Sequence, residues 1–126
     1  MERLSRSTAP ISFGDMSPAP ARIVHLGLGA FHRAHQAWYT DVVDHDRNWG
    51  ISSFTGRTAQ AAIPIAEQDG LFTLITRSAE RDDLSIVRSI VSASNGAEPG
   101  RLLNAVAHPD TALVTLTVTE SGYRLQ

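Results

Sequence analysis

The chain has 126 residues, a formal net charge of −2, no cysteine, and no lysine among its 11 basic residues. This charge balance leaves no basic patch for a nucleic acid and no polybasic membrane anchor, and the lack of cysteine excludes disulfides and thiolate metal sites. No apolar run reaches the length of a signal-peptide core or a membrane span, so we expect a cytoplasmic protein without nucleic-acid or membrane partners.

The chain begins with a segment rich in serine, threonine and proline. We therefore expect residues 1–20 to be a flexible lead-in and residues 21–126 to form one folded domain. Residues 22–26 form the near-continuous apolar run of a strand that is buried on both faces. A helix is expected over residues 31–46, with a sheet-facing stripe made of Phe31, Ala34, Trp38 and Val42.

The remaining elements continue this alternation of strand and helix. We expect a strand over residues 50–55, a short helix over 58–68 that bends near Pro64, strands over 71–76 and 84–91, a helix over 101–107 and a final strand over 112–119. The charged turn at residues 78–83 makes the middle two strands a hairpin. The pattern predicts an α/β, Rossmann-like fold with a mostly parallel sheet, flanking helices and a β-hairpin, and the length fits only a partial domain of this type.

A glycine turn joins the first strand to the first helix. Gly27 permits a tight turn, and Gly29 lets the backbone approach a pyrophosphate whose charge is met by amides at the helix start. We therefore predict a cofactor-binding turn formed by Gly27, Gly29, Ala30, Phe31, His32 and Arg33. His32 replaces the usual third glycine, so it either holds the helix away from the sheet or points its imidazole toward the ligand. Arg33 either meets a phosphate or carboxylate or is an ordinary surface arginine.

The end of the second strand decides which dinucleotide is preferred. An acidic residue there accepts hydrogen bonds from the ribose hydroxyls, but this chain has none between Asp46 and Glu67. Thr55, Arg57 and Thr58 instead offer a guanidinium and two hydroxyls, which suit a 2′-phosphate. The cofactor prediction is therefore NAD or NADP.

His32 and His35 have a spacing that could hold a metal ion. No carboxylate lies at a helical spacing that would complete the ligand set, so we predict no metal site. We expect His35 to pack beside Phe31 and Trp38 with a hydrogen-bond partner instead.

The string from Gly27 to Asp41 resembles the G-x-G-x-F-H-R-A-H-Q-x-x-Y signature of the long-chain mannitol dehydrogenase family, which includes mannitol 2-dehydrogenases and fructuronate, tagaturonate and altronate oxidoreductases. Weaker matches follow at residues 49–51, 68–74 and 115–123. The resemblance implies the cofactor-binding domain of an NAD(P)-dependent polyol or sugar-acid dehydrogenase, which passes hydride between nicotinamide and a secondary alcohol or ketone. It also implies that Thr119 and Glu120 lie near the nicotinamide.

The same resemblance places catalysis outside this chain. The family's catalytic base is a lysine in a C-terminal, mostly helical domain, and no lysine is present here. We therefore expect no catalytic residue in this chain, which alone is inactive, and expect the sugar alcohol or hexuronate to meet a catalytic domain that the chain lacks. The alternative is a stand-alone, non-catalytic nucleotide-binding module. A final strand without further sheet neighbours would expose an apolar edge that favours self-association.

Overall fold

Four parallel strands form the central sheet of the computed structural model, which describes residues 2–124. Their order is β5-β2-β1-β6, so the chain first builds the sheet toward one edge and then crosses back to the other side of β1. This is the order of the first half of a doubly wound sheet, and it confirms the expected fold class. The strands are β1 (Ala21–Leu26), β2 (Gly50–Phe54), β5 (Ile90–Ser94) and β6 (Leu113–Leu116).

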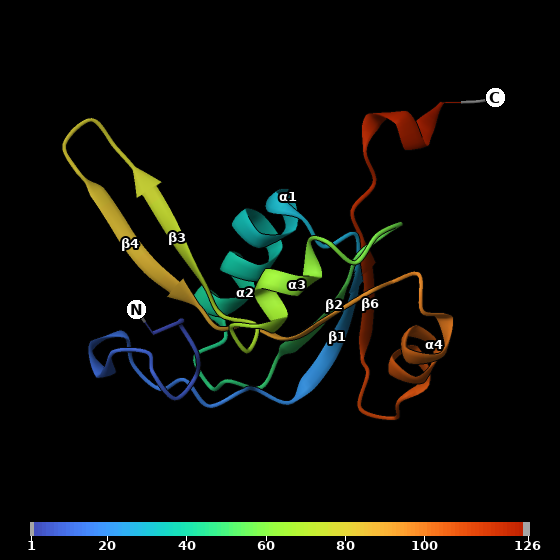
Figure 1. Ribbon diagram of the computed structural model, residues 1–126, viewed down its shortest axis with the longest axis horizontal. Coiled ribbons are helices and arrows are strands. Elements are labelled where there is room, and N and C mark those ends of the chain that lie inside the picture. Colours follow the sequence, from blue (N-terminus) through green and yellow to red (C-terminus); the bar gives the residue numbers. More distant parts are fainter. Residues whose placement is uncertain (1, 125–126) are drawn as a thin grey trace.

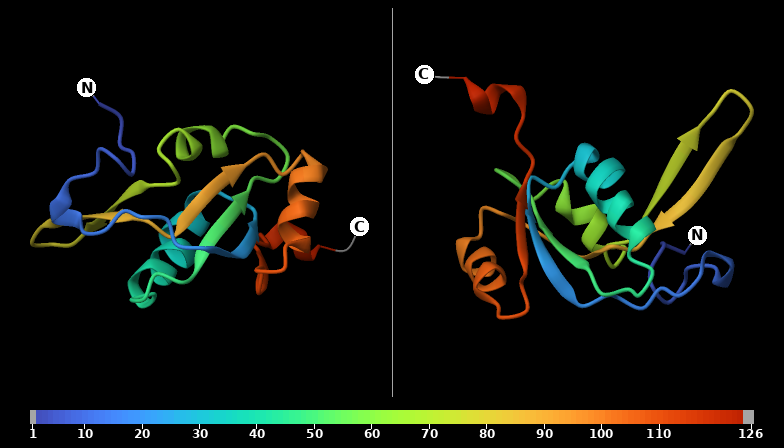
Figure 2. Two further views of the ribbon diagram at one scale, coloured as in Figure 1. Left: turned by 90° about the horizontal axis from the view of Figure 1, so that it is seen from below. Right: turned by 180° about the vertical axis from the view of Figure 1, so that it is seen from behind.

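Helices cover both faces of this sheet (Figures 1 and 2). One face carries α3 (Ala62–Ala66) and a continuous helical segment made of α1 (Ala30–His32), the π-helical turn η2 (Arg33–Ala37) and α2 (Trp38–Val43). The opposite face carries α4 (Pro99–Ala107), which follows β5 during the crossover to β6. Pro99 suits the start of α4, because the first-turn amide that proline lacks has no intrahelical partner.

The long helical segment presents only part of the stripe that the sequence predicts, because Trp38 packs against the core but Phe31 and Val42 do not. Phe31 is 65% exposed and Val42 is 47% exposed, whereas His32 and Ala37 are buried against the sheet. The cause is the π-helical turn, which inserts an extra residue per turn and lets two side chains five positions apart face the same layer. The segment also ends at Val43 rather than residue 46, because Asp44 leaves the helical conformation.

Two further sequence predictions fail in detail. The expected helix over 58–68 is only the short α3, in which Pro64 occupies the first turn, where proline is tolerated. The strand expected over 84–91 is two strands. The first of them, β4 (Asp82–Val87), pairs antiparallel with β3 (Phe72–Arg77), and this pairing confirms the hairpin. The second, β5, joins the main sheet beside β2. The hairpin projects from the body of the molecule (Figure 1).

The core lies between the sheet and the long helical segment. Its buried members come from β1, the glycine turn, η2, β2, α3, the base of the hairpin and β5. They are Ile23, Leu28, Ala37, Ile51, Ala62, Ile65, Phe72, Val87 and Ile90. The last strand is less well covered. β6 is shorter than predicted and forms one edge of the sheet among residues 2–124, with Leu113 and Leu116 exposed. Self-association through this edge stays a prediction.

The N-terminal segment packs along the base of the hairpin. Met16 is buried with Leu71 and Ile86, and the short 3-10 helix η1 (Ile11–Phe13) precedes it. The Arg6 guanidinium donates hydrogen bonds to the carbonyl oxygens of Met16, Arg88 and Ile90 at 2.8, 3.2 and 2.9 Å. The flexibility expected for residues 1–20 stays a prediction.

A carboxylate on α2 ties the helix to the junction between β4 and β5. Asp41 Oδ1 accepts hydrogen bonds from Arg47 Nη1 at 2.9 Å and from the Arg88 backbone amide at 3.2 Å. Arg88 Nε lies 3.3 Å from the same oxygen. Ser89 follows immediately and donates its hydroxyl to the Ala37 carbonyl at 2.6 Å. These contacts explain why the chain leaves the hairpin at Arg88 instead of continuing one long strand.

We predict that Asp41→Ala lowers the free energy of unfolding by about 2 to 3 kcal/mol, because two largely buried guanidiniums lose their shared acceptor. Urea unfolding followed by circular dichroism measures the loss. Asp83→Ala is the matched control, since its ion pair with Arg81 is exposed and should contribute less than about 1 kcal/mol. Equal losses in the two variants would contradict the role given to Asp41.

Candidate functional site

The turn after β1 depends on a glycine conformation. Gly27 has φ +106°, a region that residues with a side chain rarely adopt. The amides of Gly27 and Leu28 both donate to the Phe54 carbonyl at the end of β2, at 2.8 and 2.9 Å. A Cβ at Gly27 would lie 2.9 Å from Cβ of Thr117. The turn therefore holds the carboxyl ends of β1, β2 and β6 close together.

Gly29 has a different role, because its backbone is extended and needs no glycine. A Cβ built there would have only one neighbour within 4 Å, the Gly27 carbonyl at 3.9 Å. The space in front of Gly29 is therefore open. The first-turn amides of Ala30, Phe31 and His32 follow directly, and such amides have no partner within their own helix. Open space beside unpaired amides is what a phosphate group requires.

The structure places His32 at the interface between the helix and the sheet. Its imidazole is 1% exposed and lies between the helix and the sheet. The ring stacks on His25 of β1 with centroids 3.6 Å apart, and its Nε2 lies 3.0 Å from the Ser53 hydroxyl on β2. His32 therefore fills the space between the helix and the sheet, and it also lines the cavity beside the turn. A contact between its imidazole and a cofactor stays a prediction.

His25 connects this stack to β6. Its Nδ1 lies 2.7 Å from the Thr115 hydroxyl, and its Nε2 lies 2.9 Å from the Thr117 hydroxyl. Gln36 from the π-helical turn donates to the same Thr115 hydroxyl at 3.1 Å. The sequence could have indicated this contact, because Thr115 and Thr117 are two residues apart in a predicted strand and therefore point to the same face.

A cavity of about 300 Å³ opens beside this polar cluster, at the carboxyl ends of β1 and β6. It lies where the sheet order reverses, which is the position at which open α/β sheets bind ligands. The cavity is lined by His25, Phe31, His32, Gln36, Leu116, Thr117, Val118 and Tyr123.

Both buried histidines are held in the neutral form. Burial lowers the pKa of His25, and burial together with the neighbouring His25 lowers the pKa of His32 to about 3. The floor of the cavity is therefore polar but uncharged near neutral pH.

Of the other predicted site residues, Arg33 and Thr55 make hydrogen bonds within the protein, and the remaining three are exposed. Arg33 stays beside the glycine turn, where its Nε donates to the Gly29 carbonyl at 3.3 Å. Thr55 is buried, and its hydroxyl accepts the Gly96 amide at 3.2 Å. Arg57 is exposed at the end of β2, while Thr119 and Glu120 are exposed beyond β6, where the 3-10 helix η3 (Glu120–Tyr123) begins.

The two histidines of the helix lie in different surroundings. No group of three or more potential ligand side chains occurs within residues 2–124. Whereas His32 is buried, His35 is exposed, stacks on Phe31 at 4.1 Å and places Nδ1 2.8 Å from the Phe31 carbonyl. The expected packing of His35 beside Phe31 is confirmed.

Within the described residues, no helix is long and apolar enough to cross a membrane.

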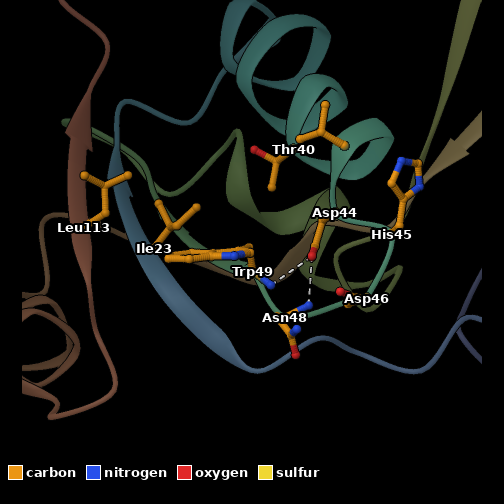
Figure 3. Close-up of a pocket in the computed structure, with 9 residues that line it drawn as sticks. Ile23, Thr40, Asp44, His45, Asp46, Asn48, Trp49 and Leu113 are labelled. Carbon is orange, nitrogen blue, oxygen red and sulfur yellow. Dashed lines mark hydrogen bonds between the residues drawn. The ribbon is translucent and has the colours of Figure 1, made fainter.

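A cavity of about 500 Å³ lies at the opposite end of the strands (Figure 3). Its polar centre is Asp44, but that carboxylate already accepts the amides of Asn48 at 2.9 Å and Trp49 at 2.8 Å. The Asp44 carboxylate therefore stabilises the turn that follows α2, and both of its oxygens are already used as hydrogen-bond acceptors. The cavity also lacks a helix N-terminus, so we place the candidate site at the smaller cavity beside the glycine turn.

Comparisons with known proteins agree with this geometry. The family model for the mannitol dehydrogenase Rossmann domain matches residues 21–125. D-mannonate oxidoreductase of Escherichia coli (strain K12) is 42% identical over 116 residues, which cover 86% of this chain and 24% of that protein. Mannitol 2-dehydrogenase of Pyrenophora tritici-repentis (strain Pt-1C-BFP) is 40% identical over 109 residues, which cover 80% of this chain and 19% of that protein.

A solved structure supports the fold. The crystal structure of a D-sorbitol dehydrogenase in substrate-free form matches with a TM-score of 0.76 and 25% sequence identity, covering 98% of this chain and 28% of that chain. This chain thus spans about a quarter of the length of the relatives it matches.

We predict that acid destabilises the protein through His32. The folded pKa lies far below the usual value near 6.5, so the unfolded chain binds more protons below that value and stability falls as the pH drops. The limiting slope for one such histidine is about 1.4 kcal/mol per pH unit.

Urea unfolding at about pH 7 and about pH 5 tests this prediction. His32→Gln should lose less stability between the two conditions than the parent, whereas the exposed control His108→Gln should behave like the parent. Identical pH dependence in all three proteins would contradict it.

Proposed function

Because the chain belongs to the mannitol dehydrogenase family, we propose that it binds a nicotinamide dinucleotide as the cofactor domain of a polyol or sugar-acid dehydrogenase. The observation that carries the proposal is the open space at Gly29 beside the first-turn amides of the helix. A pyrophosphate placed there meets amide donors and the positive end of the helix dipole. The Arg33 guanidinium lies beside the same turn and adds a positive charge.

The two ends of the cofactor would extend from this turn along the carboxyl edge of the sheet. We propose that the adenosine end lies toward β2 and Arg57, and that the nicotinamide end lies toward β6, Thr119 and Glu120. Thr55 supports the adenosine end indirectly, because its hydroxyl and amide already bond to the loop after β5. The cofactor is NAD or NADP.

When bound, the nicotinamide supplies the hydride acceptor or donor, and the chain's own groups orient it. Three of the proteins that this chain is similar to are named D-mannonate oxidoreductase, mannitol 2-dehydrogenase and D-arabinitol 4-dehydrogenase. We therefore propose a sugar alcohol or a sugar acid as the substrate of the longer enzyme. His25 and His32, which line the cavity, have lowered pKa values, so neither is a strong base. We therefore assign proton transfer to residues outside this chain.

We predict that Gly29→Val lowers dinucleotide affinity by at least about a hundredfold, because its side chain occupies the space of the pyrophosphate. Titration followed by cofactor fluorescence measures the affinity. Ala79→Val is the control, since it adds a branched side chain at an exposed position in the turn of the hairpin. Equal dissociation constants for Gly29→Val and the parent would remove the site from this turn.

We also predict that this chain binds cofactor without oxidising or reducing sugars. Alcohol oxidation needs a group that takes the hydroxyl proton while hydride leaves, and no lysine is present to do so. The assay follows NADH and NADPH absorbance with mannitol, fructose and fructuronate. Turnover above the no-protein control that disappears in Glu120→Gln would contradict the prediction.

A further inference from the structure

The end of β2 carries a free positive charge. Arg57 is exposed and has no hydrogen-bond or ion-pair partner within residues 2–124. The next acidic residues along the chain are already engaged, since Glu67 pairs with Arg3 at 2.9 Å and Asp69 accepts the Arg6 amide at 3.1 Å. Neither of these two carboxylates is therefore free to accept hydrogen bonds from ribose hydroxyls.

A second guanidinium lies beside the neighbouring strand end. Arg101 on α4 approaches the Ser94 hydroxyl at the end of β5, with Nη1 and Oγ 3.5 Å apart. Arg101 and Ser94 line a groove of about 170 Å³ together with Ala59, which follows Arg57 by two residues. Glu98 lines the same groove but forms no ion pair with Arg101 among the described residues. The sequence alone did not indicate Arg101, because nothing local brings α4 to the end of β2.

The two strand ends are fixed to each other. The Thr55 amide donates to the Ser94 carbonyl at 2.9 Å, and the Gly96 amide donates to the Thr55 hydroxyl at 3.2 Å. A Cβ at Gly96 would collide with the Thr55 carbonyl, so the two loops touch backbone to backbone. The loop that carries Arg57 and the helix that carries Arg101 are thus anchored to adjacent, rigid positions.

We propose that Arg57 and Arg101 bind the 2′-phosphate of NADP(H), and that this chain prefers NADP(H) to NAD(H). The inference rests on the proposed dinucleotide site. Arginine forms strong charge-assisted hydrogen bonds to phosphate, and the β2 end adds no carboxylate of its own to repel it. The groove holds the single carboxylate of Glu98, and the two guanidiniums outweigh its charge. The buried Thr55, which the sequence suggested as a phosphate contact, instead holds the two loops together.

The test is a fluorescence titration of the 126-residue chain with NADPH and with NADH. The parent should bind NADPH at least about tenfold more tightly. Arg57→Ala and Arg101→Ala should each weaken NADPH by about tenfold and change NADH by less than about twofold, because only NADPH carries the 2′-phosphate. Arg77→Ala is the matched control, since Arg77 is another exposed arginine but lies on the hairpin.

Competition with small adenosine nucleotides measures the contribution of the 2′-phosphate to binding separately. Adenosine 2′,5′-bisphosphate should displace bound NADPH at a lower concentration than adenosine 5′-monophosphate, and the difference should shrink in Arg57→Ala. Equal affinities for NADPH and NADH in the parent, or equal losses for both cofactors in the variants, would overturn the 2′-phosphate site while leaving the dinucleotide site standing. Binding of neither cofactor would overturn the dinucleotide site itself, and the inference with it.

Discussion

The site depends on one backbone turn at which three strand ends converge. Gly27 adopts a conformation that favours glycine, and its amide and that of Leu28 share the Phe54 carbonyl on β2. Thr117 lies so close that a Cβ at Gly27 would press against it. Once the turn is fixed, the helix must start directly above the carboxyl edge of the sheet. The positive end of the helix then faces the reversal in strand order, where the proposed phosphate lies.

The space beneath that turn is filled by polar rings rather than by aliphatic packing. The stacked imidazoles of His25 and His32 bridge helix, β1, β2 and β6 through the hydroxyls of Ser53, Thr115 and Thr117. A helix with regular α-helical spacing would not bury both His32 and Ala37. The π-helical turn between them makes that possible and brings Gln36 to Thr115. The irregular helix is therefore part of how the site is built.

Local patterns were enough to predict the features that depend on neighbouring residues. Strand β1, the glycine turn, the β3–β4 hairpin and the parallel α/β layout follow from apolar runs and glycine positions. The features that were missed depend on contacts between distant residues. The break between β4 and β5 follows from Asp41 binding the Arg88 amide, and the burial of His32 follows from its stack on His25. The placement of Arg101 requires the β5–α4 connection, which no local pattern shows.

The most direct test of the central claim is a backbone-amide NMR titration of the chain with NADPH, because it reports every region at once. Binding at the glycine turn predicts the largest shifts at Gly29–Arg33, with further shifts at Arg57 and Gly96. The cavity at Asp44–Trp49 should stay unperturbed. Shifts concentrated at Asp44–Trp49, with the glycine turn unchanged, would contradict a dinucleotide site at the carboxyl edge of the sheet.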